Sequence, residues 1–229
     1  MMRVGFITLG CLTLVGLVSI SIWNIAGNPP PVNLPQLVYQ NLNLSGVEHP
    51  ITAVLLNFRS YDTLLEIGVL VIAGIAGISM AKTASLEDPE LRTSDSLLYA
   101  LQRWFLPLML MLAGYLLWAG SDRPGGAFQA GAVLAATGVL MRLSGIPMAF
   151  LQPGLLLRLG LVLGFMVFLL VGVASAIGGS AFLGYPPNLT KSLILIIETV
   201  LTFSIAMVLL ALFVSAPVND AEDPEEGAS

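Results

Sequence analysis

The chain has 229 residues, of which 56% are hydrophobic and only 10% are charged, and its mean hydropathy is +0.90. Soluble domains carry about 25% charged residues, so this composition excludes an ordinary soluble protein. The apolar runs are continuous and about 20 residues long, the helix length that a hydrocarbon core of about 30 Å requires. They lack the regular alternation of a transmembrane barrel. The sequence therefore predicts an all-α integral membrane protein.

The net charge of −5 arises largely near the C-terminal end, where five acids and no base lie between Asp220 and Glu226. We expect residues 215–229 to form a solvated, disordered tail, and the acidic balance argues against nucleic acid as a partner. Cys11 is the only cysteine and His49 the only histidine. The chain alone therefore offers no disulfide and no ordinary zinc or haem site, and we expect no metal and no cofactor. It also lacks a nucleophile–base pair, so a stand-alone enzyme is not expected.

The first apolar stretch, residues 4–26, follows Arg3 and ends near Trp23. A basic residue before an apolar run also resembles a signal peptide, but the run is long, so we expect an uncleaved helix. Residues 27–50 follow as a linker with four prolines between Pro29 and Pro35 and with many Asn and Gln residues. This linker is too polar to span a membrane and too rich in proline for a long helix.

The second span has two possible registers. It could begin at Asp62 and end near Met80, with Glu66 about one turn inside the membrane. It could instead begin at Ile51 and run about 30 residues, or about 45 Å, with Glu66 near its middle. A break around Ser60 is favoured. After a polar loop at 81–98, four more spans are predicted, giving about six transmembrane helices in all: 102–119, 126–144, 154–177 and 191–214.

The distribution of basic residues predicts the orientation. With the N-terminus inside, the inner segments hold six of them and the outer segments three. Because cytoplasmic segments are enriched in Lys and Arg, both termini are predicted to lie in the cytoplasm. The inner residues are Arg3, Lys82, Arg92, Arg103, Arg142 and Arg158, and the outer ones are Arg59, Arg123 and Lys191.

Small residues recur on single faces of three predicted helices. Small side chains let helix backbones approach closely in lipid, where packing drives association. These faces indicate packing inside the bundle or, alternatively, docking on other membrane subunits. They comprise Gly68, Gly74 and Gly77 on the second span, Ala127, Gly131, Ala135 and Gly138 on the fourth, and Gly160 and Gly164 on the fifth.

A charged cluster opens the second span. Arg59, Asp62 and Glu66 are spaced three and four residues apart, so on a helix they share one side. An ionisable side chain inside a membrane helix is costly and indicates function. The alternative is that Arg59 and Asp62 mark the membrane interface and that Glu66 forms a structural hydrogen bond.

The sixth span adds Lys191 and Glu198, which are seven residues apart and therefore share a face, about 10 Å apart along the axis. In the predicted topology Glu66, Glu198 and the turn at Asp122 all lie toward the outer side. One hypothesis is that they line an outward-facing polar vestibule. The alternative is that Lys191 reaches the interface while Glu198 forms a hydrogen bond within the bundle.

The stretch Asp122–Gly131 predicts a tight turn followed by a helix. Pro124 and Gly125 favour a turn with positive φ at the glycine. Gly126 then leaves backbone N–H groups free at the start of a helix, where partial positive charge collects. Such a terminus can hold an anion or orient a carboxylate, although it can equally be a tight return into the bilayer.

This stretch resembles the Pro-Gly-Gly-Gly-Phe signature of the MnhB/MrpB subunits of multisubunit Na⁺/H⁺ antiporters. The matching residues are Pro124, Gly125, Gly126, Phe128 and Gly131, with Ala127 in place of the third glycine. Residues 98–214 also resemble the four-helix layout of that family.

A second stretch, residues 53–66, resembles the end of the large MrpA protein of these antiporters, and it also resembles the small MbhE protein of membrane-bound hydrogenases. The chain thus resembles a fusion of an MrpA-tail or MbhE-like module (1–97) with an MnhB-like module (98–214). Asn57 stands where the family pattern has an aspartate, and Leu65 where it has a glycine. The missing acid matters for any cation site that would need it.

The resemblance implies a multi-pass accessory subunit in the cell (inner) membrane, with other membrane subunits as partners and Na⁺ and H⁺ as transported ions. Glu66 and Asp62 would handle protons or Na⁺, and Arg59 would tune them. Two alternatives remain open. The chain could be the ion-translocating part of a redox-driven complex related to hydrogenases or complex I, or it could be a purely structural scaffold.

Overall fold

The computed structural model describes residues 2–27, 33–80, 96–146, 148, 151, 154–186 and 188–215. Several predictions fall outside the described residues. They concern the acidic tail beyond Ser215, most of the 81–98 loop with Lys82 and Arg92, and three of the linker prolines, Pro29, Pro30 and Pro31.

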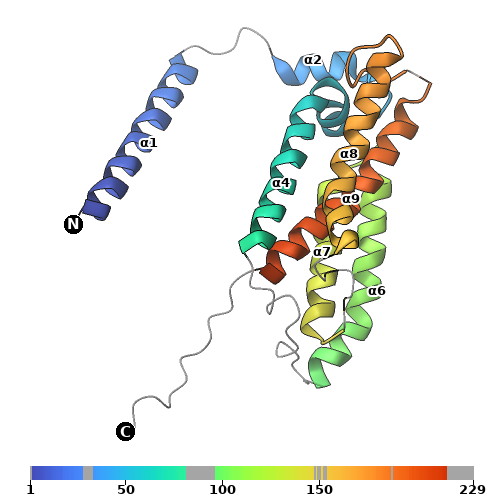
Figure 1. Cartoon of the computed structure of the whole chain (residues 1–229). Helices are drawn as coiled ribbons and strands as arrows, with labels where there is room; N and C mark the ends of the chain where they lie inside the picture. Colours follow the sequence, from blue (N-terminus) through green and yellow to red (C-terminus); the bar gives the residue numbers. More distant parts are fainter. Residues whose placement is uncertain are drawn as a thin grey trace. The chain divides into compact units, whose positions relative to one another are not determined.

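The described residues are helical wherever they have regular structure, which confirms the predicted all-α class (Figure 1). Four of the helices are long and apolar enough to cross a membrane: Ser60–Met80, Ala100–Ala119, Leu155–Ile177 and Thr190–Ser215. Two further apolar stretches, Gly10–Asn24 and Ala127–Leu143, are shorter. The elements in chain order are α1 (Met2–Gly27), α2 (Leu34–Asn41), η1 (Leu42–Leu44), α3 (Pro50–Ala53), η2 (Val54–Phe58), α4 (Ser60–Met80), α6 (Ser96–Ala119), α7 (Ala127–Leu143), α8 (Leu155–Ile177) and α9 (Thr190–Ser215).

The chain divides into two compact units, residues 1–40 and 41–229. The first unit contains α1, a helix over nearly the whole of the predicted first span, whose apolar side chains between Leu12 and Trp23 are exposed. Within the described part of the linker, residues 33–50, the short helix α2 is followed directly by the 3₁₀ turn η1, and Pro35 lies in the first turn of α2. A proline is tolerated there because the first N–H groups of a helix have no intrahelical partner.

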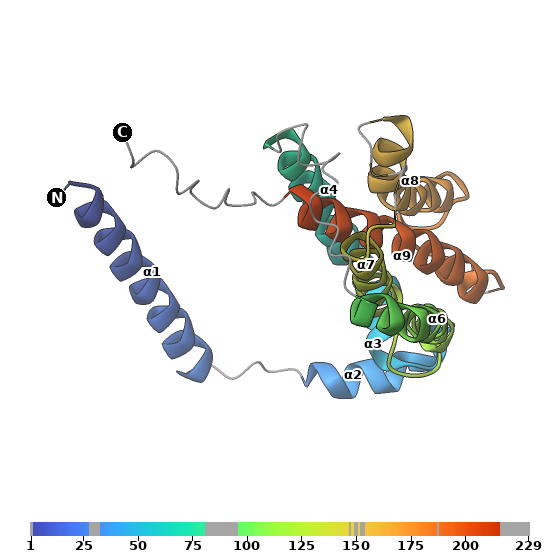
Figure 2. The same ribbon diagram turned by 90° about the horizontal axis from the view of Figure 1, so that it is seen from below.

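The second unit is a bundle organised around α9, which packs against α4, α7 and α8, while α6 packs against α7 (Figure 2). In the most apolar window of α9 56% of the residues are buried, against 11% in α6. Successive long helices run in alternating directions, so the N-terminal ends of α4 and α9 and the α6–α7 connection lie at one end of the bundle (Figure 1). That alternation agrees with the predicted order of crossings.

Small residues make the close contacts within this bundle. A Cβ at Gly131 would lie 2.9 Å from Cγ2 of Ile205, and one at Gly138 would lie 2.7 Å from Cδ2 of Leu210. The backbone of α7 therefore lies directly on α9, and a larger residue at either position would require Ile205 or Leu210 to shift. On α8, a Cβ at Gly164 would lie 2.6 Å from Cβ of Ser204 on α9. These contacts confirm that the small faces pack inside the bundle.

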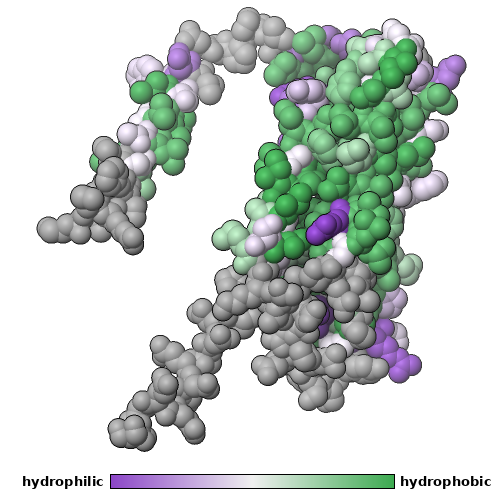
Figure 3. All heavy atoms as spheres, in the orientation of Figure 1, coloured by the Kyte–Doolittle hydropathy of each residue, from purple (hydrophilic) through white to green (hydrophobic). Residues whose placement is uncertain are grey.

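The visible outer surface of the bundle is mostly hydrophobic (Figure 3). On α6, Trp104 and Trp118 are both exposed, one toward each end of the helix, as aromatic residues at the two membrane interfaces are. A surface of this kind suits lipid or the apolar faces of neighbouring membrane helices.

The second predicted span is broken, as the sequence favoured. After α3 the backbone forms a π-helical turn over Val54–Phe58, and α4 begins at Ser60. The hydroxyl of Thr63 donates to the carbonyl of Leu55 at 2.6 Å, which holds the two segments together across the break. The continuous α-helix from Ile51 is therefore wrong, because the hydrogen-bonding pattern changes at Val54.

Candidate functional site

Glu66 lies in an open groove on the outside of α4. The groove has a volume of about 690 Å³ and is lined by Arg59, Asp62, Leu65, Glu66, Val69, Leu70 and Phe128. Glu66 is exposed and lies six residues into α4, or about 9 Å along the axis from Ser60. Phe128 comes from the first turn of α7, so the groove joins the charged cluster to the Pro-Gly-Gly stretch.

The charges in this groove are not balanced. Arg59 and Asp62 form an ion pair, and both side chains are exposed to a large extent. Neither of the two ion pairs among the described residues includes Glu66. The groove therefore contains one carboxylate whose charge no described residue compensates.

Glu198 has the opposite environment. It is only 3% exposed, and its carboxylate accepts a hydrogen bond from the backbone N–H of Ala127, the first residue of α7. Its Oε2 atom is buried without a hydrogen-bond partner among the described residues. Glu198 thus caps the start of α7 from the neighbouring helix α9, where the helix dipole favours negative charge.

The α6–α7 connection brings its backbone against this carboxylate. A Cβ at Gly126 would lie 2.8 Å from Oε1 of Glu198, and one at Gly120 would lie 3.2 Å from the same atom. The N–H of Gly126 donates to the carbonyl of Leu116 at 2.9 Å, which closes the turn. Glycines at these two positions leave the room that Glu198 occupies.

The predicted positive φ is at a different glycine. Gly126 has a φ of +111°, whereas Gly125 is not in the positive region. The reason Gly125 carries no side chain is steric, because a Cβ there would lie 2.4 Å from the carbonyl oxygen of Leu116. Pro124 is exposed at the tip of the turn, and Gly131 lies one turn further along α7 against α9.

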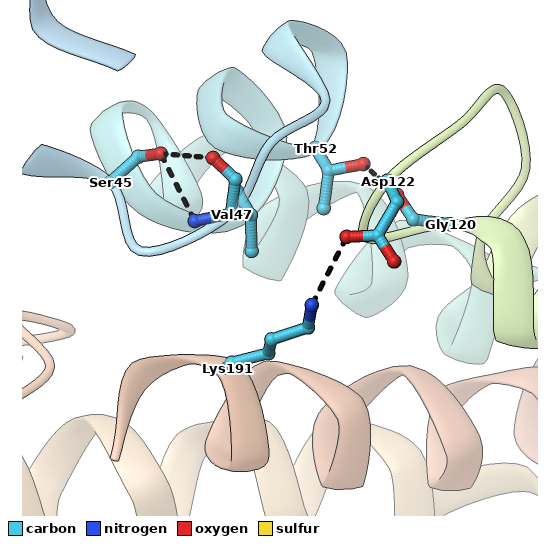
Figure 4. Close-up of polar contacts among 6 residues, drawn as sticks. All are labelled: Ser45, Val47, Thr52, Gly120, Asp122 and Lys191. Atoms are coloured by element: carbon cyan, nitrogen blue, oxygen red, sulfur yellow. Dashed lines mark hydrogen bonds and ion pairs between the residues drawn. The ribbon is translucent and has the colours of Figure 1, made fainter. Parts of the chain in front are cut away.

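The outer edge of the connection is held by a second set of contacts (Figure 4). Nζ of Lys191 lies 3.1 Å from Oδ1 of Asp122, and the hydroxyl of Thr52 donates to the carbonyl of Gly120. The N–H groups of Glu48 and His49 both donate to the carbonyl of Ser121. Lys191 and Glu198, on one face of α9, therefore fasten the same connection at two points.

These outer residues line a second groove, of about 440 Å³, separate from the first. Its lining consists of Glu48, Tyr115, Trp118, Ala119, Asp122, Arg123 and Lys191. The structure does not bring Glu66, Glu198 and Asp122 into one vestibule. Glu66 is exposed in the first groove, Asp122 is exposed in the second, and Glu198 is buried in the bundle. Within this chain the arrangement therefore agrees with the alternative, in which Glu198 forms a hydrogen bond inside the bundle.

Asn57 has a structural role of its own. Its side-chain Nδ2 donates to the carbonyl of the buried Ser45 at 2.9 Å. An aspartate could not make this bond, because a carboxylate only accepts. The amide thus joins the π-helical turn to the preceding segment. Sequence reasoning saw only a missing acid here, and it also missed Phe128 as a wall of the Glu66 groove, since neither contact has a signature in spacing.

Among the described residues no group of three or more His, Cys, Asp or Glu side chains is placed to hold a metal ion. The candidate chemistry is therefore that of two single carboxyl groups, Glu66 in an open groove and Glu198 at a helix N-terminus.

Residues 97–218 match the family model described as a domain related to the MnhB subunit of the Na⁺/H⁺ antiporter. The match covers more than half of the chain. The chain belongs to the MnhB family. This is a family of antiporter subunits and not one of enzymes, and the apolar helices make this member a multi-pass membrane protein, as predicted for the cell membrane.

A relative from Rhizobium meliloti (strain 1021), described as a probable K⁺/H⁺ antiporter A/B subunit, is 30% identical to this MnhB-family chain over 166 residues. The alignment covers 62% of this chain and 16% of the relative, so the chain corresponds to a small part of that longer protein.

Two solved structures share the fold. A chain of the Mrp complex from Dietzia sp. DQ12-45-1b has a TM-score of 0.66 and 20% identity, over 96% of this chain and 26% of that one. A chain of the membrane-bound sulfane sulfur reductase, an archaeal respiratory membrane complex, has a TM-score of 0.65 and 22% identity, over 90% of this chain and 96% of that one.

Proposed function

We propose that this chain is a membrane subunit of a multisubunit Mrp-type monovalent cation/proton antiporter, where it contributes to assembly and where Glu66 lies on the ion path. Membership of the MnhB family and the name of the Rhizobium meliloti relative support the type of complex. Other membrane subunits are its partners, and Na⁺ or K⁺ and H⁺ are the transported ions.

The exposed carboxylate of Glu66 carries this proposal. It is surrounded on α4 by exposed apolar residues such as Leu65, Val69 and Ile72. A charged side chain facing hydrocarbon costs about 2.5–3.5 kcal/mol at the centre of a span, and such residues face protein or water instead. Glu66 therefore faces a neighbouring subunit or a water-filled space that this subunit helps to form.

The charge pattern of the groove suits exchange of one ion for another. Arg59 neutralises Asp62, so Glu66 supplies the uncompensated negative charge. A carboxylate binds either a proton or a monovalent cation, because the proton removes the charge that attracts the cation. Competition at one carboxyl group couples the two ions, and Arg59 tunes the affinity through its effect on the local field.

The proposed function also includes the division of the chain into two modules, residues 1–97 and 98–214. The part aligned with the Rhizobium meliloti relative, 62% of the chain, is larger than the region that the family model matches. The archaeal reductase chain, of which 96% is covered, has the same fold over the equivalent length. Both observations support an N-terminal module joined to the MnhB module in one subunit.

The test is cation-dependent proton exchange in membrane vesicles that contain the complete complex, with Na⁺ and K⁺ compared. Glu66→Gln is expected to lower the exchange rate at least about 100-fold, the contribution typical of a positioned proton-transferring group, while subunit levels stay equal. Asp122→Asn is the matched control, because it also neutralises an exposed acid but lies in the other groove. Unchanged exchange in Glu66→Gln would leave the scaffold role as the function.

A second candidate is an ion-translocating subunit of a redox-driven complex, favoured by the fold shared with the archaeal respiratory complex. Purification of the native complex separates the two. Iron–sulfur subunits that co-purify in stoichiometric amounts would favour the redox-driven assembly, and their absence from an intact, exchanging complex would favour the antiporter.

A further inference from the structure

Glu198 is a buried acid that the proposed function does not use. It lies on a transmembrane helix, is 3% exposed and belongs to neither of the ion pairs in the described residues. A buried charge without a partner is strongly unfavourable, and buried polar groups are normally hydrogen-bonded. Its environment therefore needs an explanation beyond the packing of α9.

The titratable groups around Glu198 do not neutralise it. On α9 itself Lys191 is paired with Asp122 of the α6–α7 connection, where Arg123 is exposed. The other titratable groups of the segments toward this end of the bundle are Glu48 and His49 before α3, Arg59 before α4, Tyr61, Asp62 and Glu66 on α4, Tyr115 on α6, and the buried Tyr185 before α9. The only titratable residue of α8 is Arg158, in its first turn and at the opposite end of the bundle (Figure 1).

The two oxygens of Glu198 differ in a way that suits a proton. The carboxylate accepts the N–H of Ala127, so the start of α7 fixes its position. Oε2 has no partner among the described residues although it is fully buried. A proton on Oε2 would remove the net charge while the bond from Ala127 remained. A positive helix terminus with a buried, half-satisfied carboxyl group thus forms a site for H⁺.

The same turn of α7 also borders the Glu66 groove. Ala127 bonds to Glu198, and the next residue, Phe128, lines the groove with Glu66 and Asp62. Glu198 therefore contacts this turn from α9, whereas Glu66 of α4 lies in the groove that Phe128 helps to line. The ring of Phe128 stands on the groove side of that turn.

We propose that Glu198 is a second proton-binding site of this subunit, and that Phe128 is the barrier between it and the Glu66 groove. The inference rests on the proposed function in one respect, since the proton exchanged at Glu198 would come from the groove. It names the residue that holds the proton inside the bundle and the side chain that controls access.

The first experiment measures protonation directly and does not depend on transport. Infrared difference spectra of the purified native complex are recorded over a pH titration, and the carboxylic-acid C=O stretching band is followed. The expected result is a titrating band that disappears in Glu198→Gln and persists in Glu66→Gln. A band that is unchanged in Glu198→Gln, or the absence of any titrating band that Glu198→Gln removes, would overturn the proposal.

The second experiment tests the barrier. Phe128→Ala is expected to speed the pH-jump response of the Glu198 band at least about tenfold, whereas Phe128→Leu, which keeps a large apolar side chain, is expected to change it little. Tenfold corresponds to about 1.4 kcal/mol in the barrier. Equal response rates in wild type and Phe128→Ala, at equal assembly, would contradict the role of Phe128.

The outcomes also separate this inference from the proposed function. If Glu66→Gln leaves cation exchange unchanged while the Glu198 band titrates, the groove loses its role on the ion path and the Glu198 site stands. If Glu66→Gln abolishes exchange while Glu198→Gln alters neither exchange nor the infrared band, Glu198 is a structural cap and the proposed function stands.

Discussion

Glu66 and Glu198 are the same residue type and lie at similar distances from the start of two apolar helices, yet they differ in burial and in hydrogen bonding. Glu198 accepts a backbone N–H from α7 and is buried, whereas Glu66 is exposed in a groove and no described residue compensates its charge. The bundle supplies a hydrogen-bond donor to Glu198 from its own backbone but supplies no ion-pair partner to Glu66 among the described residues. Under the proposed function, the exposed Glu66 marks the position at which another subunit or water contacts α4.

The largest expected loss of stability comes from a substitution that disturbs the buried environment of Glu198. Gly126→Ala places a Cβ 2.8 Å from Oε1 of Glu198, at a backbone with φ +111° and ψ −175° that is essentially restricted to glycine. Strain alone costs about 1–3 kcal/mol, and displacement of the carboxylate adds to it. A lower midpoint of thermal unfolding of the complex in detergent checks this.

Gly114→Ala is the control, because a Cβ there meets no atom within 4 Å and alanine favours helix over glycine by about 1 kcal/mol. It is expected to leave the midpoint equal or higher. Equal midpoints in wild type and Gly126→Ala would mean that the turn adjusts without cost and that its glycine is not required.

An intermediate loss of stability is expected from a substitution in the turn that precedes α4 and the Glu66 groove. Asn57→Asp supplies the acid of the family pattern but removes the donor to the Ser45 carbonyl and sets two acceptors against each other. Loss of this bond is expected to destabilise the complex by about 1–3 kcal/mol, measured by thermal unfolding. Asn57→Ser, which keeps a hydroxyl donor, is the companion variant. A complex with Asn57→Asp that is as stable as wild type would contradict the structural role of the amide.

The smallest effect concerns the exposed ion pair between Asp122 and Lys191. Both side chains are substantially exposed, so Asp122→Asn is expected to cost less than about 1 kcal/mol, and high salt should remove the difference. Unfolding midpoints measured at low and high ionic strength check this. A large, salt-independent loss would show that Lys191 fastens the α6–α7 connection more firmly than an exposed pair can.

Much of the fold follows from sequence because hydropathy determines which segments can cross a bilayer. The spans near 62–80, 102–119, 154–177 and 191–214 all appear as helices of sufficient length. The helix at 127–143 is shorter than a full span because the Pro-Gly-Gly turn occupies the residues before it, and Arg142 lies in its last turn.

Less of the candidate site than of the fold could be predicted from the sequence. Spacing placed Asp62 and Glu66 on one face of α4, and both line the same groove. Arg59 joins them there although it lies before the first residue of α4, at the end of the π-helical turn. Spacing could not tell which acid is buried, since that depends on contacts between helices distant in sequence. The free N–H groups at the start of α7 suggested a bound carboxylate, but only the packing of α9 on α7 identifies Glu198 as its source.

The π-helical turn before α4 has a rotational consequence. The N–H of Arg59 bonds to the carbonyl of Val54, five residues back, so this turn contains one residue more than an α-helical turn. Each residue turns an α-helix by about 100°. Deleting one residue from Val54–Phe58 would therefore swing Glu66 by that angle around the axis of α4, or force the packing of Gly74 on Val208 to yield. The direction in which Glu66 faces therefore depends on the number of residues in the preceding turn. A change of length there would reorient the proposed ion-binding groove without changing any of its side chains.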